Sequence, residues 1–330
     1  MWQHLMADGV WRIDYQMRPD ANLEEVSRED VVRERINGQL GRTVDASEYE
    51  IVWVGPYAYR SECLDQLRCG RVLFVGDAAH VVSPFGARGG NSGVQDADNL
   101  AWKLAAVVQL RAAPELLDSY HAERHEAALQ NVLVTNRTAR FLRPADGAER
   151  LFRTAVISLA KRHAFARQLV NTGRMSTPNV YSLSGACHSS GGRPAQNVAF
   201  AWPDNQNGKN GNAKKTGELA DLLGWARGYL LLLVFGDLAA PDIQRLGKLV
   251  LTQPVRCVQV VAKAGQVQVR EAVIDVNGHL LATCKGTTPA SAATAVRWAL
   301  LRPDTYVAAM GGHIDAELVN AANAALGRAA

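Results

Sequence analysis

The fold is decided by residues 70–104, which read GRVLFVGDAAHVVSPFGARGGNSGVQDADNLAWKL. The apolar run Val72–Val75 predicts a buried β-strand that ends at Gly76 and Asp77. A glycine-rich loop follows, and a helix is predicted over residues 93–110. A strand that carries a carboxylate at its C-terminal end, just before a loop and a helix N-terminus, is a common binding place for a polar ligand in α/β folds.

The loop between this strand and helix combines a carboxylate with several glycines. Asp77 can accept hydrogen bonds from hydroxyl groups of a ligand. Glycines let the backbone approach a flat or phosphorylated ligand closely, and those of the loop are Gly86, Gly89, Gly90 and Gly93. The loop is therefore a candidate ligand site.

Residues 70–104 resemble the GD motif of the FAD-dependent aromatic hydroxylases, the single-component flavoprotein monooxygenases related to phenol hydroxylase and p-hydroxybenzoate hydroxylase. The shared pieces are G-D-A-A-H, P-F-G, G-G-N-S-G and Q-D-A-D-N-L-A-W-K-L. Such a contiguous match is far more specific than an isolated glycine pattern. The resemblance implies an enzyme that hydroxylates a phenolic or other aromatic substrate, using FAD, O2 and either NADH or NADPH as reductant.

The resemblance also implies which residues hold the cofactor. In the family, the aspartate at Asp77 binds the ribityl chain of FAD, and the loop Pro84–Asn91 lies along the isoalloxazine ring. The helix N-terminus that follows faces the pyrimidine edge of the flavin, where N–H groups and the helix dipole stabilise negative charge. The implied cofactor-binding residues are Gly76, Asp77, Pro84, Gly86, Gly89, Gly90 and Asn91.

Catalytic and metal-binding residues are not evident in this region. His80 can titrate near neutral pH, but its neighbours favour a role in ordering the loop by hydrogen bonding. Arg88 is unusual among the small residues of the loop. It either attracts an anionic substrate or the phosphates of the nicotinamide cofactor, or it points to solvent. No catalytic acid, catalytic base or metal ligand is predicted.

One element of the family's fold has no counterpart in the sequence. FAD-binding folds of this family open with a strand and G-x-G-x-x-G, which holds the pyrophosphate, and this pattern is absent. The family's middle Asp-Gly motif is not identifiable either, because Asp8-Gly9 reads better as a turn before a strand over 10–17. We expect the C-terminal portion of a hydroxylase. The alternative is a truncated, non-catalytic chain, or a half-protein needing an N-terminal partner, that does not bind FAD alone.

The expected fold class is mixed α/β: the C-terminal part of an FAD/NAD(P)-binding flavoprotein hydroxylase fold, followed by a thioredoxin-like α/β domain. A remnant of the substrate-binding domain is expected at 1–69, and the C-terminal part of the FAD-binding domain, with the GD motif and long helices, at 70–172. The Ser, Gly and Pro content of 173–193 indicates a linker. The thioredoxin-like domain is expected at 194–330, with a polar loop over 203–215.

The N-terminal segment predicts two strands and a helix. Besides the strand at 10–17, Glu50–Tyr59 is rich in β-branched and aromatic residues, which favours a second strand. Ser27–Asp30 is a weak capping box, and it opens a helix that extends to about Leu40. Two tyrosines of the second strand, at 57 and 59, could face an aromatic substrate, but packing is the better interpretation.

Helices dominate residues 93–172. The first is expected to bury an apolar stripe made of Val94, Ala97, Ala101, Leu104 and Val108. Its polar residues Asp96, Asp98 and Asn99 are interpreted as capping and dipole compensation. A second helix is predicted over 114–142, and further helices over 146–172. His121 and His125 share a face of the second helix, but H-A-E-R-H is not the zinc motif H-E-x-x-H, so a zinc site is not favoured.

The C-terminal part alternates strands and helices. Strands are expected at 229–235, 255–261 and 298–301, a strand or turn at 274–275, and helices at 241–251, 291–295 and 314–326. This layout and the phrase Leu-Arg-Pro-Asp-Thr-Tyr-Val at 301–307 resemble the thioredoxin-like domain of the phenol-hydroxylase branch. A working thioredoxin carries C-x-x-C after its first strand, whereas Phe235–Pro241 contains no cysteine. Redox activity of this domain is therefore not expected.

The composition argues against several classes of protein. Of the 330 residues, 48% are hydrophobic and 21% charged, and the net charge is +4, as in ordinary globular proteins. Dispersed Lys and Arg residues argue against a nucleic-acid partner, and the longest apolar run, Tyr229–Phe235, is too short for a membrane span. Five cysteines without a C-x-x-C pair favour reduced thiols. We expect a cytoplasmic protein whose partners are a small aromatic substrate and O2, with a homodimer as a possible assembly.

Overall fold

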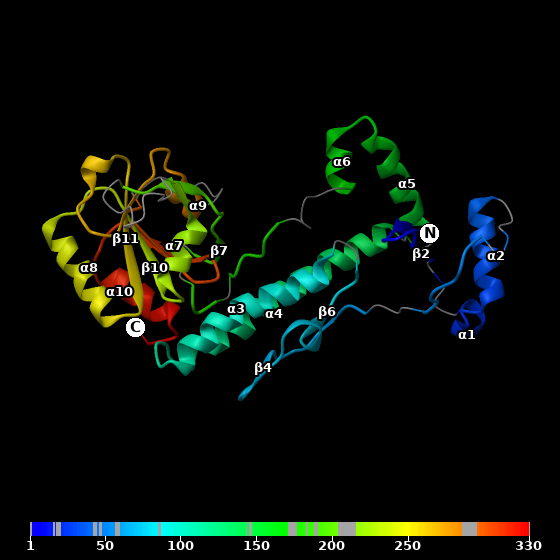
Figure 1. Cartoon of the computed structure of the whole chain (residues 1–330), viewed down its shortest axis with the longest axis horizontal. Helices are drawn as coiled ribbons and strands as arrows, with labels where there is room; N and C mark the ends of the chain where they lie inside the picture. Colours follow the sequence, from blue (N-terminus) through cyan, green and yellow to red (C-terminus); the bar gives the residue numbers. More distant parts are fainter. Residues whose placement is uncertain are drawn as a thin grey trace. The chain divides into compact units, whose positions relative to one another are not determined.

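The structure is a computed structural model of the chain (Figure 1). It describes residues 2–15, 17, 21–41, 45, 48–56, 60–84, 87–142, 144, 147–170, 177–182, 184–187, 191–203, 216–285 and 296–329. The chain divides into two compact units, Met1–Tyr59 and Arg60–Ala330. Each unit is described by itself.

The first unit begins with a β-hairpin. Strands β1 (Trp2–Leu5) and β2 (Trp11–Asp14) pair in antiparallel fashion. Between them Asp8 and Gly9 have positive φ angles of 53° and 76°. Asp-Gly is a preferred sequence for such a turn, because both residues tolerate the left-handed region. The interpretation of Asp8-Gly9 as a turn is confirmed, although the strand after it is shorter than expected.

Two helices follow in the first unit. Helix α1 (Leu23–Val26) ends at Ser27, and helix α2 (Glu29–Leu40) ends at Gly41, which has a positive φ of 66°. The predicted helix to Leu40 is confirmed, but its capping box is wrong. Ser27 closes α1, and Arg28 precedes α2 without a side-chain capping hydrogen bond.

The second strand expected in this unit does not form in residues 50–56. A β-branched segment becomes a strand only where a partner accepts and donates backbone hydrogen bonds. No described residue of the chain pairs with this segment. Tyr57 and Tyr59 lie outside the described residues.

The second unit opens with two short antiparallel strand pairs, one enclosed in sequence by the other. Strand β3 (Glu62–Cys63) pairs with β6 (His80–Val81), and β4 (Arg68–Cys69) pairs with β5 (Val72–Leu73). The expected buried strand is therefore wrong in length and burial, since Val72 is 55% exposed. Its only partner in the described part of the chain is β4.

Four helices follow these strand pairs. Helices α3 (Arg88–Val108) and α4 (Leu116–Leu142) pack side by side, and α5 (Ala148–Ala160) and α6 (Ala164–Val170) continue the chain (Figure 1). The predicted helices of this region are confirmed. Helix α3 begins earlier than expected, at Arg88, so Gly89, Gly90 and Gly93 belong to its first turns. No helix in the described part of the chain is long and apolar enough to cross a membrane.

Helix α3 buries a different face from the one expected. Val94 and Val108 of the predicted apolar stripe are 69% and 72% exposed. The buried side chains include Asp96, Asn99 and Lys103 instead. The expected stripe contained apolar residues alone. The face that α3 buries also carries these three polar side chains, which pair with polar groups of neighbouring elements.

A sheet of eight described strands forms the C-terminal part, in the order β7-β14-β13-β10-β11-β12-β8-β9. The strands are β7 (Arg193–Pro194), β8 (Ala199–Ala201), β9 (Thr216–Glu218), β10 (Leu230–Phe235), β11 (Val255–Val261), β12 (Ala272–Ile274), β13 (Trp298–Leu301) and β14 (Tyr306–Gly311). Helix α8 (Ala240–Thr252) connects the parallel pair β10 and β11, and β13 and β14 are antiparallel. The fold class, mixed α/β with a thioredoxin-like domain, is confirmed.

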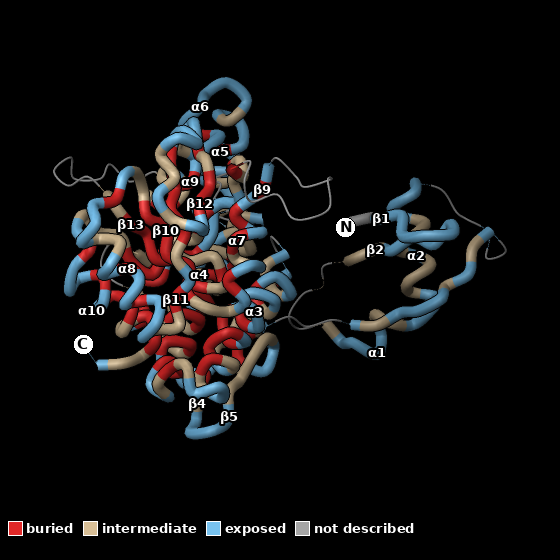
Figure 2. The backbone as a smooth tube through the Cα atoms, turned by 60° about the vertical axis from the view of Figure 1, so that its left-hand side comes forward, coloured by how far each residue is buried: buried red, intermediate tan, exposed pale blue. Residues whose placement is uncertain are grey.

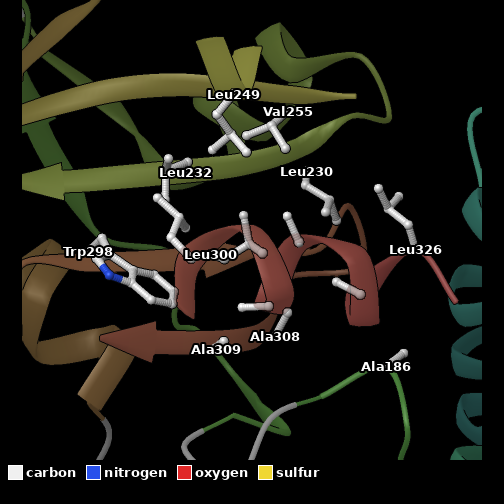
Figure 3. Packing of buried hydrophobic residues seen from close by; sticks show 14 of the residues in the cluster. Ala186, Leu230, Leu232, Leu249, Val255, Trp298, Leu300, Ala308, Ala309 and Leu326 are labelled. Atoms are coloured by element: carbon white, nitrogen blue, oxygen red, sulfur yellow. The ribbon is translucent and has the colours of Figure 1, made fainter. Parts of the chain in front are cut away.

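Helices cover both faces of this sheet, so β10 is apolar on both sides. Alternate residues of a strand point to opposite faces. Leu232 packs with α8 and α10 (Ala316–Ala325) on one face (Figure 3), and Leu231 packs with α7 (Leu219–Ala226) and α9 (His279–Lys285) on the other. The buried residues gather along these strands (Figure 2).

Most predicted elements of the C-terminal part are confirmed within a few residues, namely β10, β11, β12, β13, α8 and α10. Helices α7 and α9 were not expected. The predicted helix at 291–295 and most of the polar loop at 203–215 lie outside the described residues.

The long helices and the sheet share one hydrophobic core. Trp102 of α3 and Leu116 of α4 belong to the same buried cluster as the residues of α10. Gly327, with a φ of 68°, lies so close to α4 that a Cβ there would be 2.4 Å from the Leu116 nitrogen. The two parts of the second unit are therefore tightly packed against each other.

We expect the C-terminal domain to be inactive as a dithiol oxidoreductase. Residues 235–241 join β10 to α8 where a thioredoxin would carry its cysteines, and they contain none. Burial raises the pKa of Cys257 and Cys284 to about 12, which suppresses the reactive thiolate. Insulin reduction with dithiothreitol should match the rate without protein, and thioredoxin serves as positive control. Protein-dependent turnover above that rate would refute this expectation.

Candidate functional site

Asp77 lies in a tight turn between β5 and β6. The turn is a short 3-10 helix, Gly76–Ala78, and Gly76 has a positive φ of 60°. Asp77 is exposed, and among the described residues no hydrogen bond or ion pair involves its carboxylate. The carboxylate therefore retains its capacity to accept hydrogen bonds from a ligand.

The first turns of α3 lie directly against the Asp77 turn. A Cβ on Gly93 would lie 3.4 Å from the Cα atom of Gly76, so the two backbones are in contact. A Cβ at this position would make only an ordinary van der Waals contact with the turn. The contact between the two segments brings an exposed carboxylate next to a helix N-terminus.

The N-terminus of α3 is open. Ala87 stands at the cap position with a positive φ of 52° and gives no side-chain capping hydrogen bond. Gly90 is exposed, and nothing lies within 4 Å of the place where its Cβ would be. Asn91 donates from its amide to the Ala87 carbonyl at 2.7 Å. Helix N–H groups in such a turn attract partial negative charge.

The remaining residues expected to hold the cofactor lie in the same segment. Pro84 is exposed after β6, and Gly89 is half-buried, with its Cβ position 3.8 Å from Val82. Gly86 lies outside the described residues. The turn and the start of α3 thus form one candidate site, which the resemblance identified.

Asp96 of α3 is the buried partner of the turn. Its Oδ2 atom accepts the Gly76 N–H at 3.0 Å and lies 2.7 Å from His80 Nε2. Its Oδ1 atom accepts Arg124 Nε at 2.6 Å. The expected loop-ordering role of His80 is confirmed. The interpretation of Asp96 as dipole compensation is wrong, because it lies beyond the first turn of α3 and is fully buried.

A second buried cluster lies deeper between α3, α4 and the sheet. Glu123 of α4 accepts hydrogen bonds from Lys103 Nζ at 2.8 Å, Arg302 Nη2 at 2.8 Å and Asn99 Nδ2 at 2.6 Å. Arg302 Nε also donates to Asp304 Oδ1 at 3.0 Å. Asn99 therefore belongs to this cluster, which corrects its interpretation as a capping residue.

The phrase at 301–307 supplies Arg302, Asp304 and Tyr306 to this cluster. Arg302 lies within about 5–6 Å of the rings of Trp102, Tyr181 and Tyr306, a distance suited to cation–π attraction. Sequence reasoning noted the phrase as a resemblance only. One sequence signal for a buried charge cluster is Lys103, a charged residue that lies between Trp102 and the other buried residues of α3.

Charged neighbours lower the pKa values of the buried carboxyl groups of Asp96 and Glu123. Burial alone would raise the pKa of Asp96, but the hydrogen bond from His80 and the charge of Arg124 outweigh it and lower that pKa. For Glu123, burial again opposes ionisation, while Arg302 and Lys103 hold its pKa far below the ordinary range. Burial lowers the pKa of Lys103 to about 8 against the pull of Glu123.

These shifts predict acid sensitivity of the fold. The folded pKa values of Asp96 and Glu123 lie below their ordinary values of 3.8 and 4.5, so the unfolded chain takes up protons first as the pH falls. The stabilisation is complete above about pH 5.5 and is lost progressively below it. The free energy of unfolding in urea should fall between about pH 6 and pH 4, and the fall should be smaller in Asp96→Asn. Equal values at both pH conditions would contradict this account.

Arg88 takes neither of the two directions considered from the sequence. Its Nη1 atom donates to Asn131 Oδ1 of α4 at 2.8 Å, and Nη2 donates to the Thr177 carbonyl at 3.4 Å. Burial lowers the pKa of Arg88. The guanidinium thus joins the start of α3 to α4.

The histidine pair on α4 does not resemble a metal site. The rings of His121 and His125 are 5.1 Å apart between centroids, and His121 Nδ1 accepts the Leu67 N–H at 3.3 Å. Burial, reinforced by the charge of His125, lowers the pKa of His121. Within the described ranges, no three His, Cys, Asp or Glu residues could hold a metal ion together.

Part of the chain is similar to a known protein family. Residues 1–135 match the family model described as the FAD binding domain. The chain is a relative of the FAD-dependent aromatic hydroxylases. The 3-(3-hydroxy-phenyl)propionate/3-hydroxycinnamic acid hydroxylase of Mycolicibacterium gilvum is 32% identical over 192 residues, which are 57% of this chain and 33% of that hydroxylase.

Two further proteins support this relationship. Tetracenomycin B2 monooxygenase-dioxygenase of Streptomyces olivaceus is 36% identical over 157 residues, or 47% of this chain and 28% of that protein. The structure of CabE, an aromatic hydroxylase from angucycline biosynthesis, is 25% identical, with a TM-score of 0.65 over 99% of this chain and 59% of CabE. The chain thus matches about a third of the length of these curated relatives.

The resemblance to the aromatic hydroxylases is therefore confirmed. The comparisons also favour a flavin-dependent enzyme over the non-catalytic alternative. The domain boundaries at 69, 172 and 193 and the roles of the cofactor-binding residues stay predictions.

Proposed function

We propose that the protein is an FAD-dependent monooxygenase that hydroxylates a phenolic or other aromatic substrate, with NADH or NADPH as reductant and O2 as oxidant. The observation that carries this proposal is the exposed Asp77 carboxylate, which has no partner among the described residues and lies against the N-terminal turns of α3. The named activities of the relatives support the reaction class. Free cysteines at all five positions support a cytoplasmic setting.

The residues of the site fit the flavin part of FAD. Asp77 provides a carboxylate for the hydroxyls of the ribityl chain. The first turn of α3, with Gly89, Gly90 and Asn91, provides backbone N–H groups and space for a planar ring. Gly76 shapes the turn, and Pro84 follows β6. When bound, FAD would accept a hydride from the nicotinamide cofactor and use O2 to oxygenate the substrate.

The chain's own contribution is binding and electrostatics. Asp77 orients the ribityl chain by accepting hydrogen bonds, which fixes the position of the ring attached to it. The N-terminal dipole of α3 stabilises negative charge on the pyrimidine edge. The buried ion pairs beneath the turn keep these groups in place without occupying the exposed carboxylate.

Isotope transfer tests this function. Protein supplied with FAD, NADH or NADPH and a phenolic polycyclic substrate should oxidise the nicotinamide faster than without the substrate. Under 18O2, one labelled oxygen atom should appear in the product. Nicotinamide oxidation that no aromatic compound accelerates, with no labelled product, would refute the proposal.

A further inference from the structure

One buried carboxylate holds both ends of the turn that presents Asp77. Asp96 Oδ2 accepts the N–H of Gly76, the residue just before Asp77, at 3.0 Å. The same oxygen lies 2.7 Å from Nε2 of His80, three residues after Asp77. The side chains of Asp96 and His80 are buried, so water does not compete for these hydrogen bonds. The position of Asp77 therefore depends on where Asp96 is held.

Arg124 of α4 holds Asp96 from the other side. Its Nε atom donates to Asp96 Oδ1 at 2.6 Å, while its Nη1 atom donates to the hydroxyl of Tyr181 at 3.0 Å. Its Nη2 atom reaches the Ser92 carbonyl at 3.3 Å. The planar guanidinium connects these partners rigidly, so a change at Tyr181 shifts the position of the Asp96 carboxylate.

Tyr181 is anchored to the C-terminal domain. Its ring stacks on that of Tyr306 in β14, with 4.2 Å between centroids and 16° between planes. Its backbone N–H donates to the Gly192 carbonyl, and the Gly192 N–H donates in turn to Val307. A Cβ at Gly192 would lie 2.3 Å from the Tyr181 carbonyl oxygen. The ring and backbone of the tyrosine are thus held by the sheet, while its neighbours Asn179 and Ser182 hydrogen-bond to Gln130 and Glu126 of α4.

We propose that the C-terminal domain positions the Asp77 turn for flavin binding through Tyr306, Tyr181, Arg124 and Asp96. In this arrangement Asp96 and Arg124 are positioning residues, because they touch no ligand and act through the turn. The thioredoxin-like domain then has a function that does not depend on a C-x-x-C pair. It fixes the geometry of the cofactor site through this series of contacts. The inference rests on the proposed flavin site at Asp77.

A purely structural role of these residues makes a different prediction. Loss of a buried hydrogen bond would then lower the stability of the whole unit without a specific change at Gly76. Positioning requires that Gly76 loses protection selectively, and that the effect passes through Asp96. The amide of Gly76 reports this directly, because Asp96 is its acceptor.

The decisive variant is Tyr181→Phe, which removes the acceptor for Arg124 but keeps the ring that stacks on Tyr306. In flavin-free protein, hydrogen exchange of the Gly76 amide should become roughly three- to tenfold faster, and riboflavin affinity should fall by a similar factor. In an Asp96→Asn background, Tyr181→Phe should add no further change to either quantity. Arg124→Lys, a second variant that keeps the charge, should act in the same direction.

The control is Trp298→Phe, which removes a buried hydrogen bond to the His313 carbonyl away from this chain of contacts. It should lower stability without selective exchange at Gly76. Unchanged Gly76 exchange in both Tyr181→Phe and Arg124→Lys would overturn the proposal, as would full additivity with Asp96→Asn. Since exchange is measured without flavin, a wild-type protein that fails to bind riboflavin would count against the proposed function alone.

Discussion

Replacing Arg302 by Met should lower the free energy of unfolding by about 3–5 kcal/mol. The substitution leaves the fully buried carboxylates of Glu123 and Asp304 without their shared cation, although Lys103 still reaches Glu123 at 2.8 Å. An uncompensated charge in a buried site is far more costly than a lost surface contact. Urea unfolding followed by far-UV circular dichroism measures the change.

Arg140 offers a matched control for this substitution. It pairs with Glu149 at 2.6 Å, but its side chain is 76% exposed, and exposed pairs contribute at most about 1 kcal/mol. Arg140→Met should therefore change stability little. Arg302→Lys should fall between Arg302→Met and wild type, because a positive charge remains but the planar guanidinium that reaches both carboxylates is lost. Equal losses for Arg302→Met and Arg140→Met would contradict the buried-cluster account.

Replacing Asp77 by Ala should weaken FAD binding by roughly 10- to 150-fold. A hydrogen bond that involves a charged group contributes about 1.5–3 kcal/mol, and the exposed Asp77 carboxylate has no protein partner among the described residues to satisfy instead. The fold should keep its stability for the same reason. Flavin fluorescence titration measures the affinity, and thermal unfolding measures the stability.

Asp65→Ala is the control for the Asp77 substitution, because Asp65 is also exposed and lies in the same hairpin region. It removes the same charge without changing the turn. FAD affinity that falls equally in both variants would indicate a general electrostatic effect and contradict the assignment of Asp77.

The sequence predicted those helices and strands whose hydrophobic pattern alone indicates which residues are buried. The run Leu-Leu-Leu-Leu-Val-Phe of β10 is apolar on both faces, and Pro241 near the start of α8 fixes where the next helix begins. Such elements were placed within a residue or two. The Asp77 turn was found from a contiguous motif and not from periodicity.

The failures have one physical origin, which is that partners distant in sequence decide burial. Asp96 was expected to compensate the dipole of α3, yet it is buried and paired with Arg124. The buried Lys103 of the same helix pairs with Glu123, which also pairs with Arg302. Arg302 is far away in the chain, so no local pattern could reveal the pairing. The expected second strand does not form in residues 50–56 for the same reason, since strand propensity without a partner does not form a sheet.

The most direct test of the flavin site compares riboflavin with lumiflavin, which has the same ring system but no ribityl chain. If Asp77 binds the ribityl hydroxyls, wild-type protein should prefer riboflavin by at least about tenfold. This preference should disappear in Asp77→Ala and persist in Asp65→Ala. A riboflavin preference that Asp77→Ala leaves intact would contradict the account, and so would wild-type protein that binds both flavins equally.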